Sequence, residues 1–582
     1  MNRFLFILFV SFIATASKAQ NPGKPFIRLT DPLKEQNTVN TSRRFIVGST
    51  CSTCSITIKG ESVKVYPTGA FAYECRLDSG KNEYLVQAMV ANSKPVTRKI
   101  TYTYLPPVPE KELTAPGIER IQTYPEGDLI LRPGERIGFR VKAYPGSSLL
   151  VFEHISLYEL PDSVTGGLKG IYQGEYVIRE IDTFANRKIS VGLISPDGQR
   201  IIRETTSTLT VMNDTMPDVA ITHGRLAHLE YGLGDDRLGG AKVGYIDSLI
   251  RLYIIGKVGT HWKVRLAPSR TAYIPEEHVT MMPKGILRPA SLTGKIKAYG
   301  DSLFDYTEVQ LFNRLPYQSF QLTDPSRIVV DVFGATGNTN WIDQLSNLKE
   351  IKQVDYEQVS DDIFRVTIQL KHRQHWGHRI YYRDNNLIIQ IKPQPTSLSL
   401  NRLTIAVDAG HGGTNTGAGG PTGVSEKELT LAVSLKLKKA LEREGAKVIM
   451  TREKEMFFDN KERILFYRDS TPDLLLSIHL NSSADPISSG GTSTFYRYIG
   501  FRPLSQSIYK RMLELGLRDY GNNGSFNFML NSPTEYPNAL VEMLFLSNPA
   551  EEMLILDEGF QQQAVQKIVE GINDFLQECK QP

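Results

Sequence analysis

The sequence has few cysteines, little net charge and, beyond its amino terminus, no long apolar run. Its 582 residues include only four cysteines, so the fold does not depend on a dense disulfide framework. The formal net charge of +4 is too small an excess of positive charge to indicate nucleic-acid binding, and we expect no nucleic-acid partner. Hydrophobic residues make up 41% and charged residues 22%, which is near the globular average and excludes a wholly disordered chain. At about 150 residues per domain, the length indicates about four domains.

The first residues predict a signal peptide. Arg3 precedes an apolar run over residues 4–14, and residues 17–19 have the small-x-small pattern of a cleavage site, so we expect residues 1–19 to be removed and Gln20 to begin the mature chain. The run is too short for a membrane anchor, which needs about 20 apolar residues. We therefore expect an exported protein without a transmembrane segment in its mature chain, with a periplasm favoured over the cell exterior.

Three of the four cysteines lie close together near the amino terminus. Cys51 and Cys54 have the spacing of half a zinc knuckle, but no second Cys/His pair follows nearby. Cys75 is the third member of the group, and Cys579 stands alone at the other end of the chain. In an oxidising compartment the pattern favours one disulfide among the first three cysteines over a metal or redox site.

The amino-terminal half consists of short alternating runs broken by turns. Residues 25–105 predict a β-sandwich that resembles the immunoglobulin-like (Ig-like) modules of exported bacterial proteins, and the prolines of residues 106–109 predict a stiff linker. Residues 115–212 predict a second β module of unknown role. Residues 217–283, with Trp262 and tight glycine turns, resemble bacterial SH3-like domains, some of which bind cell-wall peptides. A spacer remains the alternative for this part.

Residues 290–393 predict a further β domain. An Asp-Pro-Ser-Arg turn beginning at Asp324 runs into an apolar strand that ends at residue 332, and two more strands follow at 364–370 and 386–391. This order resembles the AMIN domain, a β-sandwich found beside cell-wall amidases. The resemblance implies a role in localising an enzyme on peptidoglycan.

From residue 403 onward, strands alternate with helices. We therefore predict a multidomain chain in which several all-β modules precede a carboxyl-terminal α/β domain, residues 403–579, with a central sheet flanked by helices. The main strands of this domain are expected at 403–407, 447–450, 474–478, 491–498 and 539–544, and its helices at 428–444, through Arg463, around 508–517 and at 561–576.

Polar residues follow or end several of these strands, where α/β sheets place their functional groups. His411 lies in a Gly-rich segment after the first strand, His479 closes a later strand, and Glu542 lies in the last strand. Glu426 occupies the first position of a helix whose N-cap is Ser425, with Glu428 as the capping-box partner.

These residue types together indicate a catalytic zinc site. Two imidazoles and one carboxylate, with a fourth position open to water, form a ligand set of catalytic zinc, and a second carboxylate such as Glu542 can move the proton of the water. Singly, His411 could be a turn residue, Glu426 a helix-dipole carboxylate and Glu542 half of a buried salt bridge. We favour the zinc site because all four signals occur in one domain and in the expected order.

Residues 403–579 resemble the zinc-dependent N-acetylmuramoyl-L-alanine amidases of the Amidase_3 family. The matching motifs are Asp-Ala-Gly-His411-Gly-Gly, Ser-Glu426-Lys, Ser-Ile-His479-Leu-Asn and Val-Glu542 followed by Phe-Leu-Ser-Asn548. The resemblance implies that His411, Glu426 and His479 bind Zn²⁺ and that Glu542 is the catalytic carboxylate. It also implies structural roles for the pairs Thr451-Arg452 and Glu462-Arg463.

The resemblance predicts a peptidoglycan hydrolase that cleaves the amide between N-acetylmuramic acid and L-alanine with zinc-activated water. Two alternatives stay open: a zinc peptidase acting on stem-peptide bonds, and a wall-binding scaffold with an inactive amidase domain. Two positions depart from the family pattern: Asn415-Thr416 stands where the family often has Asp-Pro, and Leu544 stands where it often has Gly. We expect these departures to affect substrate preference more than the chemistry. The short connection over residues 481–490 predicts a site that no inserted helix blocks. Cell-division or wall-remodelling partners are left open.

Overall fold

The computed structural model describes residues 24–581 except residues 92, 108–109, 213–215, 235 and 237. The predicted signal peptide lies outside the described residues, as does part of the predicted proline linker. We propose the division expected from the sequence: a first module (25–105), a second (115–212), a third (217–283), a fourth (290–393) and the α/β domain (403–579). Within the described residues, no helix is both long and apolar enough to cross a bilayer.

The first module has a three-stranded sheet, β1-β3-β6, and a five-stranded sheet, β2-β8-β7-β4-β5, which enclose one core. A disulfide joins Cys51 to Cys54, which confirms one bond among the first three cysteines, and Cys75 is free and buried. The strands are β1 (Arg28–Asp31), β2 (Gln36–Val39), β3 (Arg43–Ser49), β4 (Ser55–Ile58), β5 (Glu61–Val63), β6 (Ala70–Arg76), β7 (Gly80–Met89) and β8 (Val96–Tyr104).

The second module is also built of strands, with one short helix. Its elements are β9 (Ile118–Tyr124), β10 (Leu129–Leu131), β11 (Arg136–Ala143), β12 (Ser148–Val151), β13 (Ile155–Glu159), α1 (Asp162–Thr165), β14 (Ile171–Val177), β15 (Arg187–Ile194) and β16 (Arg200–Val211). Strand β10 pairs in parallel with β16 and in antiparallel with β20 of the third module. One continuous sheet therefore connects the second and third modules.

The third and fourth modules share one hydrophobic core, which contains residues from Ala220 to Ile391. The third module contains β17 (Asp218–Thr222), β18 (His228–Glu230), β19 (Lys242–Tyr245), β20 (Arg251–Val258), β21 (His261–Ala267), β22 (Arg270–Pro275), η1 (Glu276–His278) and β23 (Val279–Met281). The fourth contains β24 (Ser291–Gly300), β25 (Asp305–Leu311), β26 (Tyr317–Thr323), β27 (Ser326–Phe333), β28 (Ala335–Thr336), β29 (Ile342–Gln344), β30 (Ile351–Ser360), β31 (Ile363–Leu370), β32 (His378–Arg383) and β33 (Asn386–Ile391).

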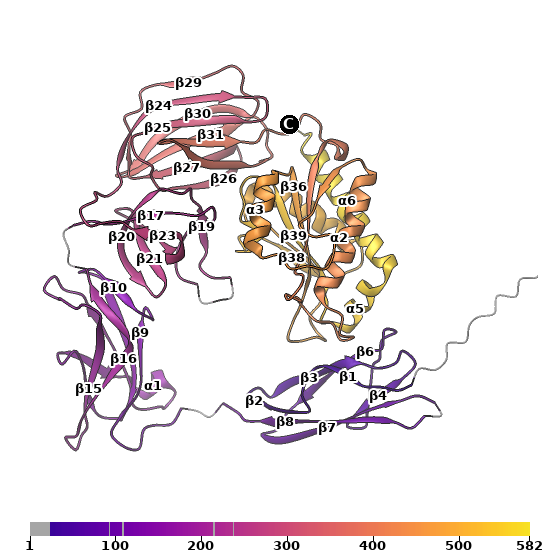
Figure 1. Ribbon diagram of the computed structural model, residues 1–582. Helices are drawn as coiled ribbons and strands as arrows, with labels where there is room; N and C mark the ends of the chain where they lie inside the picture. The colour runs from indigo at the N-terminus through magenta and orange to yellow at the C-terminus, as the bar shows by residue number, and fades with distance from the viewer. Residues whose placement is uncertain are drawn as a thin grey trace, which may run out of the picture.

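The carboxyl-terminal part is the expected α/β domain. Its six-stranded sheet has the order β35-β34-β36-β39-β37-β38, and α2 and α6 lie on the face opposite α3 (Figure 1). Its strands and α-helices are β34 (Thr404–Ala409), α2 (Glu426–Arg443), β35 (Lys447–Ile449), α3 (Asn460–Ser470), β36 (Leu474–Asn481), β37 (Thr492–Phe495), α4 (Arg502–Leu513), β38 (Asp519–Asn523), β39 (Asn538–Phe545), α5 (Pro549–Leu556) and α6 (Glu558–Glu578). It contains the short 3₁₀ turns η3 (Ile499–Phe501) and η4 (Met529–Asn531), and a third, η2 (Leu400–Arg402), directly precedes it.

Three adjacent strands of this sheet run in the same direction. β34 pairs in parallel with β36, and β36 pairs in parallel with β39. Parallel strands buried on both faces read as continuous apolar runs, and Leu474, Leu475 and Leu476 are accordingly all buried. The carboxyl ends of the three strands meet at one edge, which brings together segments that lie more than a hundred residues apart in the chain.

Candidate metal centre

The side chain of His411 is placed by the turn that follows β34. The backbone of His411 has a φ of 62°, in the left-handed region, and its Nδ1 lies 2.9 Å from Oδ1 of Asn415. The neighbouring residue must be glycine, because a Cβ at Gly410 would overlap the imidazole of His479. The glycines of this segment thus let the two histidine rings approach each other, with their centroids 5.0 Å apart.

Glu426 lies between the two imidazoles. It is the first residue of α2, whose N-cap is Ser425, and its side chain is 4% exposed. Its Oε2 is 3.1 Å from Nε2 of His411, and its Oε1 is 3.0 Å from Nδ1 of His479. The backbone N–H groups of Ala418 and Leu480 also donate to this carboxylate, at 2.8 and 2.9 Å, and fix its orientation.

Charge pairing controls the protonation of this cluster. Burial opposes ionisation of Glu426, but the hydrogen bonds from His411 and His479 outweigh it and hold the pKa of the carboxyl well below its ordinary value. Burial lowers the pKa of His479, yet the bond to Glu426 outweighs this effect and leaves that pKa raised. Glu426 is therefore a carboxylate over the working pH range, as a metal ligand must be.

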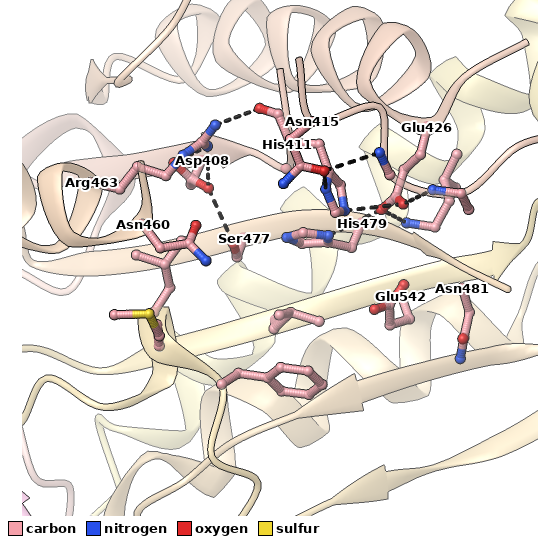
Figure 2. Close-up of a pocket in the computed structure, with 18 of the residues that line it drawn as sticks. Asp408, His411, Asn415, Glu426, Asn460, Arg463, Ser477, His479, Asn481 and Glu542 are labelled. Atoms are coloured by element: carbon pink, nitrogen blue, oxygen red, sulfur yellow. Dashed lines mark hydrogen bonds and ion pairs between the residues drawn. The ribbon is translucent and has the colours of Figure 1, made fainter. Parts of the chain in front are cut away.

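Glu542 is the neighbour of His479 in the sheet. The two residues are register partners in the parallel strands β39 and β36, so their side chains lie on the same face. Figure 2 shows Glu542 on the strand beside His479, near the cluster that His479 forms with His411 and Glu426. The structure thus brings together all four residues that the sequence singled out.

The four side chains line one cavity of 480 Å³. Its other lining residues come from β34 and the turn after it, from α3 and the segment before it, from β36 and the residue after it, from β39 and from the segment that includes η4. One further lining residue, Leu238, belongs to the third module. A single chamber therefore holds the two imidazoles, both carboxylates and room for a substrate group.

The donor set fits a zinc ion. One ligand atom from each of His411, Glu426 and His479 lies within 4.8 Å of the others, and among the described residues these three form the group that could hold a metal. Two imidazoles and one carboxylate correspond to the protein ligands of catalytic zinc sites. In a neutral His411 ring that donates from Nδ1 to the Asn415 oxygen, Nε2 is available as a metal ligand.

Two buried arginines support the turn that carries His411. Arg463 donates to both oxygens of Asp408, at 3.0 and 2.9 Å, and to the carbonyls of Ala409 and His411. Arg452 donates to the carbonyl of Ala409 at 3.1 Å and to that of Gly410 at 2.8 Å. These bonds hold three consecutive carbonyl groups and so fix the position of the His411 side chain.

The supporting residues were only partly visible in the sequence. Arg452 and Arg463 were expected to be structural from the family resemblance alone, and Asn415 was noted only as a departure from the family pattern. No sequence signal indicated Leu238, because it lies about 170 residues before the first metal-ligand candidate and in another module.

Comparisons with known proteins identify two families in this chain. The family model of N-acetylmuramoyl-L-alanine amidase matches residues 405–574, and that of the AMIN domain matches residues 305–395. The uncharacterized protein YqiI of Bacillus subtilis is 34% identical over 177 residues, which cover 30% of this chain and 84% of that protein.

Two further matches are limited to the same part of the chain. The "Probable cell wall amidase LytH" of Staphylococcus epidermidis is 31% identical over 189 residues, which cover 32% of this chain and 63% of that protein. The solved catalytic domain of CwlV, an N-acetylmuramoyl-L-alanine amidase from Bacillus (Paenibacillus) polymyxa var. colistinus, is 32% identical with a TM-score of 0.29, and the match covers 31% of this chain and 99% of that one. This chain spans less than two thirds of the length of LytH.

The chain belongs to the N-acetylmuramoyl-L-alanine amidase family and carries an AMIN domain. The resemblances of residues 403–579 to the amidase family and of residues 290–393 to the AMIN domain are thereby confirmed, whereas the Ig-like and SH3-like resemblances stay predictions. The fold class is confirmed as well, since an α/β amidase domain follows modules built of strands.

Proposed function

We propose that this chain is a zinc-dependent N-acetylmuramoyl-L-alanine amidase that hydrolyses the amide between N-acetylmuramic acid and L-alanine of peptidoglycan. The observation that carries the proposal is the convergence of His411, Glu426 and His479 beside Glu542 in one cavity. The four residues lie in the part of the chain that matches the amidase family.

His411, Glu426 and His479, which line the cavity, would hold the ion. A bound Zn²⁺ supplies Lewis-acid polarisation of the scissile carbonyl and lowers the pKa of water to about 7. The protein keeps the three ligands in place before the substrate arrives. Asn415 orients the ring of His411, and the N–H groups of Ala418 and Leu480 orient Glu426.

Glu542 is assigned the role of general base and acid. Its position beside His479 places a carboxylate at the cavity, where it can accept a proton from the attacking water. Cleavage of the amide requires a proton on the leaving nitrogen, and the same carboxyl group returns it there. The products are a free lactyl carboxylate on the sugar and a free amino group on the peptide.

The substitution Glu542→Gln tests this role. Zinc content should stay at the wild-type value because none of the three ligand candidates is changed, whereas cleavage of a soluble muramoyl peptide should fall by about 10²–10⁴-fold. Glu558→Gln is the matched control, because Glu558 is an exposed glutamate at the start of α6, away from the cavity. Full activity of Glu542→Gln would remove the proposed mechanism.

Analysis of digested cell wall separates the amidase from its alternatives. Mass spectrometry should find free lactyl groups together with intact stem peptides. Cleavage within the stem peptide would indicate a zinc peptidase, and binding without any product would indicate a wall-binding scaffold. Peptidoglycan as the proposed substrate also implies an exported protein. We therefore propose a periplasmic or cell-wall location for the chain.

A further inference from the structure

The third module is fixed against the α/β domain close to the metal centre. Leu226 of this module is 9% exposed and belongs to the same hydrophobic cluster as Ile464 and Tyr467 of α3. Beside this contact, Nη1 of Arg225 lies 3.0 Å from Oδ2 of Asp469. An apolar contact and an ion pair at the same interface hold the module in one orientation relative to the sheet.

A second set of contacts holds the segment between β18 and β19. The side-chain amide of Asn527 donates to the carbonyls of Leu238 and Gly240, at 2.8 and 2.9 Å. Arg497 donates to Oδ1 of Asn527 at 2.6 Å and also to the carbonyl of Lys242. Two polar residues of the α/β domain thus bind the backbone of the third module at three carbonyl groups.

The shape of this segment depends on its glycines. A Cβ at Gly240 would overlap the carbonyl oxygen of Gly232 and approach the buried carboxylate of Glu230, and a Cβ at Gly234 would overlap the backbone of Gly239. The backbone at Gly240 therefore lies close to that at Gly232, and the backbone at Gly234 close to that at Gly239. This close packing presents Leu238 at a defined place.

Leu238 lines the same cavity as the metal-ligand candidates and Glu542. Phe528 and Met529, which directly follow the anchoring residue Asn527, line it as well. These three side chains form an apolar part of the cavity wall, which elsewhere carries imidazoles and carboxylates. A substrate group beside this wall would present methyl or ring C–H surface rather than charge, because burying an unpaired charge there is costly.

We propose that Leu238 of the third module is a specificity-determining residue of the amidase cavity and contacts the muramoyl peptide next to the scissile amide. Asn527 is a positioning residue that holds Leu238 in the cavity wall. This inference rests on the proposed amidase activity, and it assigns to an amino-terminal module a direct part in substrate binding.

The test compares kinetics on a soluble N-acetylmuramoyl peptide for three variants of the full chain loaded with zinc. Leu238→Ala should raise KM about three- to tenfold with kcat within about twofold, because an apolar contact outside the reacting atoms is lost. Asn527→Asp should raise KM similarly, since a carboxylate cannot donate to the two carbonyls. Leu233→Ala is the matched control: Leu233 lies in the same segment, is 45% exposed and does not line the cavity, so KM should not change.

Two further measurements separate this inference from the proposed function. In the Glu542→Gln background, calorimetric binding of the same peptide should weaken about three- to tenfold on Leu238→Ala, while zinc content and unfolding temperature stay constant. Wild-type KM in both Leu238→Ala and Asn527→Asp, in an active enzyme, would overturn the inference alone. A zinc-loaded wild type that cleaves no muramoyl peptide would overturn the proposed function, and the binding comparison would still decide whether Leu238 contacts the peptide.

Discussion

Arg463→Met is the substitution that most directly tests how the buried network supports the metal centre, because it leaves every ligand candidate in place. The side chains of Arg463 and Asp408 are 2% and 1% exposed and are joined at 2.9 Å. Arg463 also holds the carbonyl groups of Ala409 and His411. Methionine keeps much of the volume but removes the charge and all of these donors.

The expected loss of stability follows from the burial of the pair. Removing one partner of a buried ion pair costs about 3–5 kcal/mol, because the other charge stays behind in the interior. Asp408 retains the hydroxyl groups of Thr451 and Tyr467, at 2.9 and 3.0 Å, so we expect the lower end of this range. A loss of about 3 kcal/mol lowers the unfolding temperature of a domain of this size by about 6–12 °C.

Scanning calorimetry of the intact chain with bound zinc measures this shift, and competition with a chromophoric chelator measures zinc affinity. Affinity should fall about tenfold because the turn that carries His411 has lost its anchor. The double variant Asp408→Asn/Arg463→Met should be more stable than Arg463→Met, since it buries no unpaired charge. An unfolding temperature within about 2 °C of wild type, with unchanged zinc affinity, would refute this account of the network.

Three other predictions concern the same domain. Burial raises the pKa of Glu552 to about 7, although the hydrogen bonds from Thr422 oppose this shift. The contribution of Glu552 to the free energy of unfolding is therefore fully present below about pH 4.5 and is lost as the pH rises toward 7, a fall of up to about 3 kcal/mol. Glu552→Gln should remove this fall in denaturation curves measured at about pH 5 and about pH 8, and an unchanged pH dependence would contradict the prediction. Asn415→Ala should weaken zinc binding about tenfold in a chelator competition, because the His411 ring loses its partner, and wild-type affinity would show that Asn415 does not orient the ring. Chelation of the metal should abolish cleavage and added Zn²⁺ should restore it; activity that persists in protein shown to be metal-free would exclude the zinc mechanism.

The meeting of the four site residues could be predicted because parallel strands place their carboxyl ends at one edge. That rule needs only the approximate strand positions, and β34, β36 and β39 lie close to the expected ranges. The pair of Asp408 and Arg463 could not be derived in this way, because it depends on how α3 packs on the sheet. The place of Leu238 depends on contacts between two modules, for which a single sequence contains no local signal.

Helix boundaries were predicted less well than the existence of the helices. The helix expected around residues 508–517 is α4, which begins at Arg502 because Pro503 is accommodated in its first turn, and which ends at Leu513. α5 was missed although Asn548 and Pro549 form a typical N-cap and first-turn pair. Both errors came from relying on apolar periodicity where the capping residues carried the information.

Strand β10 has a mechanical consequence for the whole chain. Because it pairs with β16 on one side and β20 on the other, a pull on the second module is transmitted through backbone hydrogen bonds to the third module rather than through a slack tether. The third module in turn shares one hydrophobic cluster with the α/β domain and another with the fourth module. Paired strands and shared hydrophobic clusters therefore link the second module to the α/β domain. An anchoring point on the second module would lie at a fixed distance from the cavity.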